Sequence, residues 1–460
     1  MNTSSPQFCS LSQIMASPHD ASRPVAFDGA ETYSWKHFSE SVAKLTEELA
    51  ELPETKFAIC AQNSYQFAIA FMACAHSQKH IVLPGNYQPA ALNELSAQFD
   101  GLLHDDAVEA ISGKLNIDLA LELKKRGAAQ PSLHHDLNLD VLSLTLFTSG
   151  SSGTPKAIHK SLRQIDTELV QLEQQWGDAL SSCRIHSTVS QQHIYGLLFR
   201  LLWPLCTQRP FSCQNIEFPE QVMNVAAQDS VLISSPALLK RMSTNFSSKP
   251  MRMVFSSGGP LSFDSAQLAH SLFGTYPVEV FGSTETGGIA FRQQHSSQSP
   301  WTLFSCIQAK LNSENCLGLK SPFIDINHWY QTADECEFIN GTQFILKGRT
   351  DRVIKIEEKR ISLVEVEKRL EQLAWISECV VLPFEQGQRL TLASALVLSE
   401  AGQEKVAQIG KGKFWLLLRS ELRQWLEPIA IPRRYRVCGE IPLNSQGKRL
   451  ISDIEKLLSV

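Results

Sequence analysis

The stretch VLSLTLFTSGSSGTPKAI, residues 141–158, joins an apolar run to a turn rich in glycine and hydroxyl groups. Leu142, Leu144 and Leu146 recur at every second position, which predicts a strand with one apolar face. Residues 148–156 then end the strand with residue types that favour turns and unusual backbone angles. Such a turn presents backbone N–H groups, hydroxyls and one cation together, which suits phosphate oxygens.

This turn has two other interpretations. Ser/Gly clusters are common linkers, but the strand before the turn and the Pro155-Lys156 ending argue against a plain connector. A Walker A loop needs glycine directly before the lysine and Ser or Thr after it, whereas Pro155 and Ala157 flank Lys156. These flanking residues argue against a kinase-like or GTPase-like phosphate loop.

The composition is that of a globular protein with two or more domains. The chain has 460 residues, of which 43% are hydrophobic and 19% charged. A formal net charge of −5, without runs of like charge, gives no reason to expect a nucleic acid or an anionic membrane as partner.

Cysteine usage and the absence of targeting signals predict a cytoplasmic protein. The first fifteen residues lack the basic and apolar regions of a secretory signal, and the apolar stretches 67–75 and 194–206 are too short to span a bilayer. Eleven dispersed cysteines without a CxxC pair predict free thiols rather than disulfides or a zinc site.

The order of apolar runs predicts an α/β architecture with a large N-terminal domain of several layers and a small α+β C-terminal domain. Strand-like runs such as 56–61 and 230–234 alternate with helical stretches in the first part. Near residue 340 the pattern changes: Asn340-Gly341 predicts a two-residue hairpin turn, and a helix with a capping box follows at Ser362. We therefore expect domains at 1–349 and 350–460, joined by a polar hinge.

Three further segments carry chemistry. FSSGGPL (255–261) opens a Gly-Gly-Pro turn where a flat ring could approach bare backbone, and FGSTETGG (281–288) places Thr284 beside Glu285. A hydroxyl next to a carboxylate suits a hard cation that carries phosphate oxygens. IPLNSQGK (441–448) ends on a lysine after a glycine turn. Each segment alone also fits an ordinary turn.

Together and in this order, TSGSSGTPK, GGPL, FGSTETG, YQTADE, LKGRTDRVIK and PLNSQGK resemble the core motifs of the adenylate-forming superfamily. That superfamily comprises acyl- and aryl-CoA synthetases, adenylation domains of nonribosomal peptide synthetases, and beetle luciferases. The resemblance covers nearly the whole chain, since IVLPGNYQPAAL also resembles the family's N-terminal region.

The resemblance implies roles for the matching positions. The phosphate-binding loop would comprise Thr148, Ser149, Gly150, Ser151, Ser152, Gly153, Thr154 and Lys156. The rest of the nucleotide site would comprise Gly258, Gly259 and Pro260 beside adenine, Phe281 stacking where the family usually has Tyr, Gly282, Ser283, and Asp334 with Arg349 on the ribose. The reaction centre would comprise Thr284 at the α-phosphate, Glu285 on Mg²⁺, His193 beside the acyl pocket, Lys448 as the catalytic lysine, and Asp351 as the hinge.

The implied activity is that of an acid–thiol ligase: ATP and a carboxylic acid, fatty or aromatic, give acyl-AMP, and the acyl group then passes to CoA or to the phosphopantetheine of an acyl carrier protein. Apolar residues around 194–199 favour an acyl or aryl acid over a polar amino acid. Glu358 stands where the family usually has a glycine that contacts the pantetheine arm, which leaves the acceptor open. A non-catalytic nucleotide-binding relative and an adenylating enzyme with a non-thiol acceptor are the alternatives.

Overall fold

The computed structural model describes residues 8–85, 87, 89–124, 133, 135–149, 155–349, 352–356, 359–386, 389–426, 428–444 and 449–459. The chain forms two compact units. Unit 1 comprises Met1–Gln308 and Lys320–His328, and unit 2 comprises Ala309–Leu319 and Trp329–Val460. The predicted domain boundary between residues 349 and 350 is the position of a hinge rather than a division by contacts. It stays a prediction.

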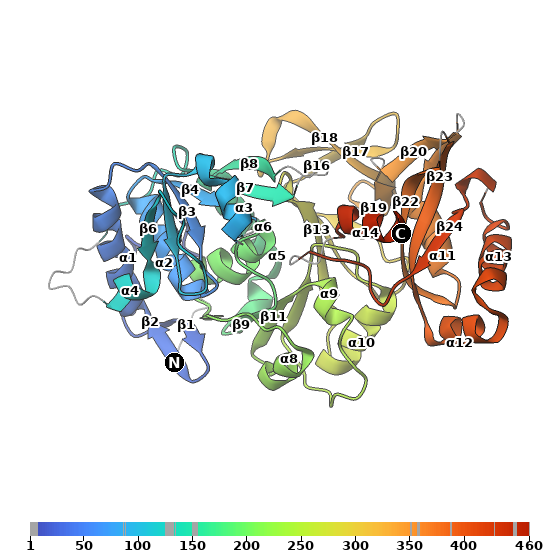
Figure 1. The fold of residues 1–460 in the computed structure, drawn as a ribbon. Helices are drawn as coiled ribbons and strands as arrows, with labels where there is room; N and C mark the ends of the chain where they lie inside the picture. Colours follow the sequence, from blue (N-terminus) through green and yellow to red (C-terminus); the bar gives the residue numbers. More distant parts are fainter. Residues whose placement is uncertain are drawn as a thin grey trace. The chain divides into compact units, whose positions relative to one another are not determined.

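One sheet of unit 1 has the strand order β6-β5-β3-β4-β7-β8. Its strands are β3 (Lys56–Cys60), β4 (His80–Leu83), β5 (Gly101–His104), β6 (Leu115–Asp118), β7 (Ser143–Ser149) and β8 (Pro155–Ser161). All neighbours are parallel except β7 and β8, which form an antiparallel hairpin. Helices α1 (Trp35–Ala50) and α2 (Ser64–His76) lie beside this sheet (Figure 1).

The second sheet of unit 1 has the order β15-β14-β13-β12-β11-β9-β10-β1-β2. Its strands are β1 (Pro24–Asp28), β2 (Glu31–Ser34), β9 (Arg184–Ser187), β10 (Phe211–Ser212), β11 (Ser230–Ser234), β12 (Met253–Ser256), β13 (Val278–Ser283), β14 (Gly287–Gln293) and β15 (Trp301–Leu303). The strands from β13 to β1 run parallel, so their carboxyl ends share one edge. Ligands of open parallel sheets bind at this edge.

The helices of unit 1 begin at the polar caps that the sequence supplies. Ser34 caps α1, Asn63 caps α2, and Ser161 forms a capping box with Gln164. The remaining helical segments are α3 (Pro89–Glu94), η1 (Ser96–Gln98), α4 (Leu119–Lys124), α5 (Leu162–Trp176), η2 (Asp178–Leu180), α6 (Ile194–Gly196), the π-helical η3 (Leu197–Leu202), α7 (Trp203–Cys206), α8 (Pro219–Val225), α9 (Pro236–Leu239) and α10 (Phe263–Phe273).

The strand predicted before the glycine-rich turn is confirmed as β7, but it is buried on both faces. Leu144 and Leu146 are buried as expected, and so are Thr145 and Phe147. The strand lies between β4 and β8 in a mostly parallel sheet, and helices usually cover both faces of such sheets.

Unit 2 contains three groups of strands and four α-helices among its described residues. The strands that lie wholly or mainly in unit 2 are β16 (Gln308–Leu311), β17 (Cys316–Ser321), β18 (Asp325–Phe338), β19 (Gln343–Arg349), β20 (Val353–Ile356), β21 (Lys359–Ser362), β22 (Ile376–Gln386), β23 (Arg389–Leu398) and β24 (Arg434–Val437). The helical segments are α11 (Leu363–Glu371), α12 (Glu400–Ile409), α13 (Lys411–Leu422), η5 (Pro428–Ala430) and α14 (Ile451–Ser459).

Side chains on both faces of the β22–β23–β24 sheet are buried, because successive residues of a strand point to opposite faces. Cys379 and Val381 of β22 pack into a core with residues of α11 and α13. The alternate residues Val380 and Leu382 pack with Ile454 and with Leu458 of α14. The period of two along β22 thus divides its side chains between two cores.

The hairpin predicted at Asn340-Gly341 is present, but its turn is longer than two residues. Strand β18 ends at Phe338, β19 begins at Gln343, and the Asn340 side chain accepts hydrogen bonds from the N–H groups of Thr342 and Gln343. A two-residue type I′ turn needs positive φ at its glycine, and Gly341 is not among the glycines with positive φ. The prediction of a two-residue turn is therefore wrong.

All eleven cysteines are free thiols, and none of them is exposed. Among the described residues, no helix has the length and apolarity needed to cross a bilayer. The predicted α/β fold class is confirmed by this architecture and by its likeness to solved structures, which is given below.

Candidate active site

The β7–β8 hairpin holds the two ends of the predicted phosphate loop side by side. Thr148 lies opposite Lys156 in the antiparallel register, and Ser149 lies opposite Pro155. The connecting residues Gly150, Ser151, Ser152, Gly153 and Thr154 lie outside the described part of the chain. Their role in phosphate binding stays a prediction, but the register fixes where this loop begins and ends.

The TETG motif forms a tight turn between β13 and β14. The Ser283 N–H donates to Thr286 Oγ1 at 2.9 Å, and the Thr286 N–H donates to Ser283 Oγ at 3.2 Å. These reciprocal bonds leave Thr284 and Glu285 at the tip of the turn. A methyl group on Gly282 would lie 2.2 Å from the Gly287 carbonyl oxygen, so glycine is required where the strands approach.

Lys156 and Glu285, from the two motifs, form an ion pair. Lys156 Nζ lies 2.9 Å from Glu285 Oε1, although the residues are 129 positions apart. Partial burial raises the pKa of Glu285, but hydrogen bonds from Lys156, from its own backbone N–H and from Ser283 outweigh it and lower the pKa overall. Glu285 is therefore a carboxylate at neutral pH, with a cation beside it.

The buried side chains of Lys160 and Glu168 hold this turn by hydrogen bonds to its backbone. Neither residue was predicted from the sequence. Lys160 Nζ donates to the carbonyl oxygens of Glu285 and Phe323 at 3.2 and 2.9 Å. Glu168 Oε1 accepts from the Gly288 N–H at 2.6 Å. Burial lowers the pKa of Lys160 and raises that of Glu168, and in each case the opposite charge of the other resists the shift.

The space that Glu168 occupies explains the glycines after the TET triplet. Gly287 has φ +67, and a methyl group there would lie 2.6 Å from Glu168 Oε2. A methyl group on Gly288 would lie 2.9 Å from the Phe304 ring. A side chain at 287 would displace the carboxylate that holds the turn, and one at 288 would push against the Phe304 ring.

The proposed adenine-binding residues lie at the same carboxyl edge, after β12 and β13. Gly258, Gly259 and Pro260 are exposed, and Gly258 has φ +92 with open space where a side chain would project. The half-buried Phe281 ring packs on Trp301, with centroids 5.4 Å apart. An exposed glycine backbone beside an aromatic ring suits a flat heterocycle.

His193 lies in a segment that joins the carboxyl edges of the two sheets of unit 1. Its neighbour Gln191 donates to the Ala61 carbonyl at 2.6 Å, and Gln192 donates to the Ile59 carbonyl at 3.0 Å. His193 directly precedes α6 and is half-buried. A methyl group on Gly196 would lie 2.0 Å from the Ser190 carbonyl, which fixes this close turn.

Asp334 and Arg349, predicted to bind ribose, are cross-strand partners in unit 2. Asp334 is buried, and its N–H donates to Thr332 Oγ1 at 3.1 Å. Lys448, Asp351 and Glu358 lie outside the described residues, so the lysine, hinge and acceptor assignments stay predictions.

The donor set fits Mg²⁺ better than a metal that needs a protein cage. Within the described ranges, no three His, Cys, Asp or Glu side chains gather as metal ligands. Glu285 offers a single carboxylate on a partly exposed turn. Mg²⁺ is commonly bound by one or two carboxylates together with substrate phosphates, so the residues present fit this ion.

Two largely parallel sheets with helices beside them define an α/β fold. Residues 15–315 match the model of the family described as AMP-binding enzyme, and the chain therefore belongs to this family, within the adenylate-forming superfamily. Membership supports ATP-dependent adenylation of an acid by an AMP-forming ligase.

Named relatives agree with this class. The chain is 21% identical over 414 residues to a D-alanine--D-alanyl carrier protein ligase of Staphylococcus aureus, covering 82% of this chain and 83% of the relative. It is similar in structure to O-succinylbenzoate Coenzyme A Synthetase (MenE) of Bacillus subtilis in complex with AMP, with TM-score 0.79, 18% identity and 98% of each chain covered. ATP-bound MatB from Rhodopseudomonas palustris gives TM-score 0.81 at 15% identity, with 98% of this chain and 99% of that chain covered.

Proposed function

We propose that this protein joins a fatty or aromatic carboxylic acid to a thiol through an acyl-adenylate. A carboxylate oxygen of the acid attacks the α-phosphorus of ATP, the bond from that phosphorus to the bridging oxygen breaks, and pyrophosphate leaves. The thiol sulfur, on CoA or on a carrier protein's phosphopantetheine, then attacks the acyl carbon. AMP leaves with the bonding electrons, and the thiol proton passes to solvent.

The observation that carries this proposal is the Lys156–Glu285 pair. It joins the end of a loop suited to phosphates to the tip of a turn that offers a hydroxyl and a carboxylate. Both reactants of the first step are anions, so the barrier is mainly electrostatic and positional. Lys156 and the loop before it would bind the β- and γ-phosphates, and Thr284 would contact the α-phosphate.

Other residues have positioning roles in the proposal. Phe281 and the 258–260 turn would border adenine, Asp334 and Arg349 would bind the ribose hydroxyls, and His193 would line the acid pocket. Glu285 would hold Mg²⁺, which when bound neutralises phosphate charge. Lys448 would bridge the acid carboxylate and the α-phosphate as a compact positive charge.

Acid-dependent exchange of labelled pyrophosphate into ATP tests the first step. A panel of fatty and aromatic acids should include at least one that supports exchange, and the Glu285→Gln variant should catalyse this exchange about 100-fold more slowly. Failure of every acid in the panel would favour a non-catalytic nucleotide-binding protein.

The acceptor is tested with CoA and a holo carrier protein in parallel. If the side chain of Glu358 obstructs the pantetheine arm, Glu358→Gly should improve the use of free CoA without changing pyrophosphate exchange. Both acceptors have precedent in the names of relatives, one a carrier protein ligase and one a Coenzyme A synthetase. Adenylation without transfer to either thiol would point to a non-thiol acceptor.

A further inference from the structure

Glu367 is a charged residue on the buried face of α11. Leu363, Val366 and Leu370 pack this face into the core of unit 2, and Glu367 is only 5% exposed. A carboxylate in such a place must be compensated by hydrogen bonds and opposite charge.

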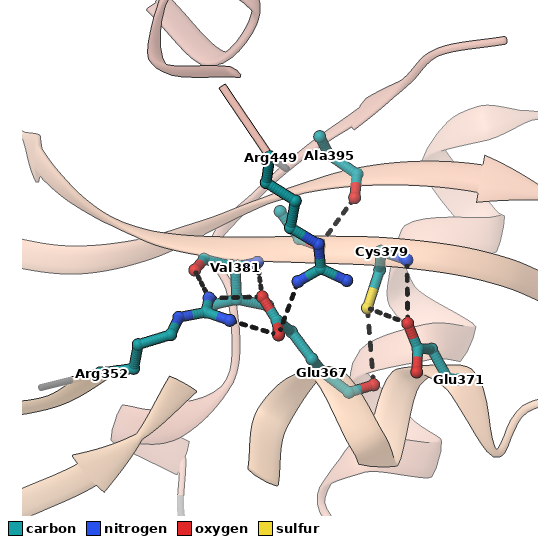
Figure 2. Close-up of polar contacts among 8 residues, drawn as sticks. Arg352, Glu367, Glu371, Cys379, Val381, Ala395 and Arg449 are labelled. Atoms are coloured by element: carbon teal, nitrogen blue, oxygen red, sulfur yellow. Dashed lines mark hydrogen bonds and ion pairs between the residues drawn. The ribbon is translucent and has the colours of Figure 1, made fainter. Parts of the chain in front are cut away.

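Arg352 supplies one compensating charge in a two-pronged arrangement. Its Nη1 donates to Glu367 Oε2 at 2.8 Å, and its Nη2 donates to Oε1 at 2.6 Å (Figure 2). The Val381 N–H donates to the same Oε1 at 2.8 Å, and the Val381 carbonyl accepts from Arg352 Nη2 at 3.1 Å. This closed set of bonds fastens Arg352 to both α11 and β22.

Arg449 supplies the second charge from a distant part of the chain. Its Nη1 donates to Glu367 Oε2 at 3.1 Å across 82 positions, and Figure 2 shows both guanidinium groups directed at one carboxylate. The backbone of Arg449 forms an antiparallel bridge with Leu443, and the Leu450 N–H donates to the Pro442 carbonyl at 3.0 Å. Arg449 is thus held by its backbone and by its side chain.

Each of the two arginines directly follows a residue with a proposed role in the reaction. Arg352 directly follows Asp351, the proposed hinge, and Arg449 directly follows Lys448, the proposed catalytic lysine. We propose that Glu367 is a positioning residue that ties the residue after the hinge and the residue after the lysine to one rigid core, so that hinge rotation carries Lys448 with it. This inference rests on the proposed function.

The substitution that tests the proposal must leave the buried carboxylate of Glu367 compensated. Glu367→Gln would leave two guanidinium groups around a neutral amide and would disturb folding together with positioning. Arg449→Met leaves the two-pronged Arg352–Glu367 pair intact, so the carboxylate stays compensated. It removes the side-chain contacts of the residue that follows the lysine, and Arg449→Lys restores a positive charge with one donor nitrogen.

The first measurement uses the full chain and compares both half-reactions. Arg449→Met should lower kcat for acid-dependent pyrophosphate exchange roughly 10- to 100-fold with little change in KM for ATP, because misplacing a catalytic group costs this much. Thiolysis of a supplied acyl-adenylate should stay within about twofold, since Lys448 serves the first step only. Arg449→Lys should recover most of the lost rate.

The matched control is Arg369→Met, on the same helix. Arg369 is half-buried, pairs with Glu365 at 3.2 Å and stacks on Trp425, and it makes no bond to Glu367 among the contacts of the described residues, so this variant should keep wild-type kcat. Wild-type kcat in Arg449→Met, or equal losses in both variants, would overturn the proposal.

A second measurement does not depend on turnover. Hydrogen exchange of the Leu450 amide should be faster in Arg449→Met than in wild type and unchanged in Arg369→Met. Unchanged exchange in Arg449→Met would contradict the anchoring role even if the protein activates no acid. An inactive wild type with altered exchange would instead count against the proposed function alone.

Discussion

Lys156 Nζ lies 2.9 Å from Glu285 Oε1, so the end of the phosphate loop and the tip of the TETG turn share one ion pair. Glu285→Gln should lower kcat for pyrophosphate exchange by about 100-fold, because it removes charge where the proposed transition state needs it. Lys156→Met should mainly raise KM for ATP, by about tenfold for the loss of one charged hydrogen bond. Lys36→Met, which breaks an exposed pair with Glu40, is the control and should change neither constant. Equal effects of all three variants would refute the assignment.

Lys448→Ala should abolish acyl-adenylate formation and spare thiolysis. The proposed role brings this ammonium group to the reacting anions in the first step and withdraws it before the second. Stopped-flow measurement of pyrophosphate release, with thiolysis of a supplied acyl-adenylate measured separately, resolves the two steps. Equal loss in both would contradict the role.

Lys160 and Glu168 should be coupled in stability. Lys160→Met removes the cation near a buried carboxylate and should lower the free energy of unfolding by about 3–5 kcal/mol. Adding Glu168→Gln keeps an acceptor for the Gly288 N–H and removes the charge, so the double variant should be more stable than Lys160→Met. Urea unfolding measures both, and Arg163→Met, which breaks an exposed pair with Asp140, should cost less than about 1 kcal/mol. Additive effects of the two buried substitutions would show that the charges do not interact.

Acid should destabilise the protein through buried histidines. Burial, then the charge of nearby His135, lowers the pKa of His76 to about 4, and neither of its ring nitrogens has a hydrogen-bond partner among the described residues. The unfolded chain binds a proton near pH 6.5 and the folded chain only near pH 4, so stability is lost as pH falls through this window. The loss for His76 reaches about 3 kcal/mol.

His76→Phe should remove this share of the pH dependence. Unfolding curves at pH 7, 5.5 and 4 would show a smaller fall in the variant than in wild type. The exposed His295, replaced by Phe, should leave the dependence unchanged. An identical fall in His76→Phe and wild type would refute the argument.

The sequence was sufficient for much of the architecture because apolar periodicity and caps are local signals. Strands β3 and β11 lie within one residue of the predicted runs 56–61 and 230–234, and α11 begins at Leu363 as expected. The turn at Asn340 was mispredicted because a side-chain hydrogen bond closes a longer loop there. Propensity for a turn does not reveal which closure is used.

The residues of the candidate site also divide into those that local sequence patterns reveal and those that they do not. Its members in the turns and at the strand ends could be found from short motifs, whereas Lys160, Glu168 and Glu367 are supporting charges from outside those motifs. A signal for the two glutamates existed: each lies at helical spacing among apolar residues, Glu168 between Ile165 and Leu172 and Glu367 between Leu363 and Leu370. A charge within an apolar stripe indicates a buried partner, but the partner comes from distant chain and has no local pattern.

The burial of the cysteines bears on a hazard of the proposed chemistry. An acyl-adenylate reacts with any accessible thiolate, including those of the protein that makes it. Burial raises the pKa of Cys213 to about 12 and that of Cys306 to about 11, and eight of the eleven thiols are fully enclosed. Burial thus keeps most of the protein's own sulfur atoms out of reach, and so protects them from acylation while the activated group passes to another molecule.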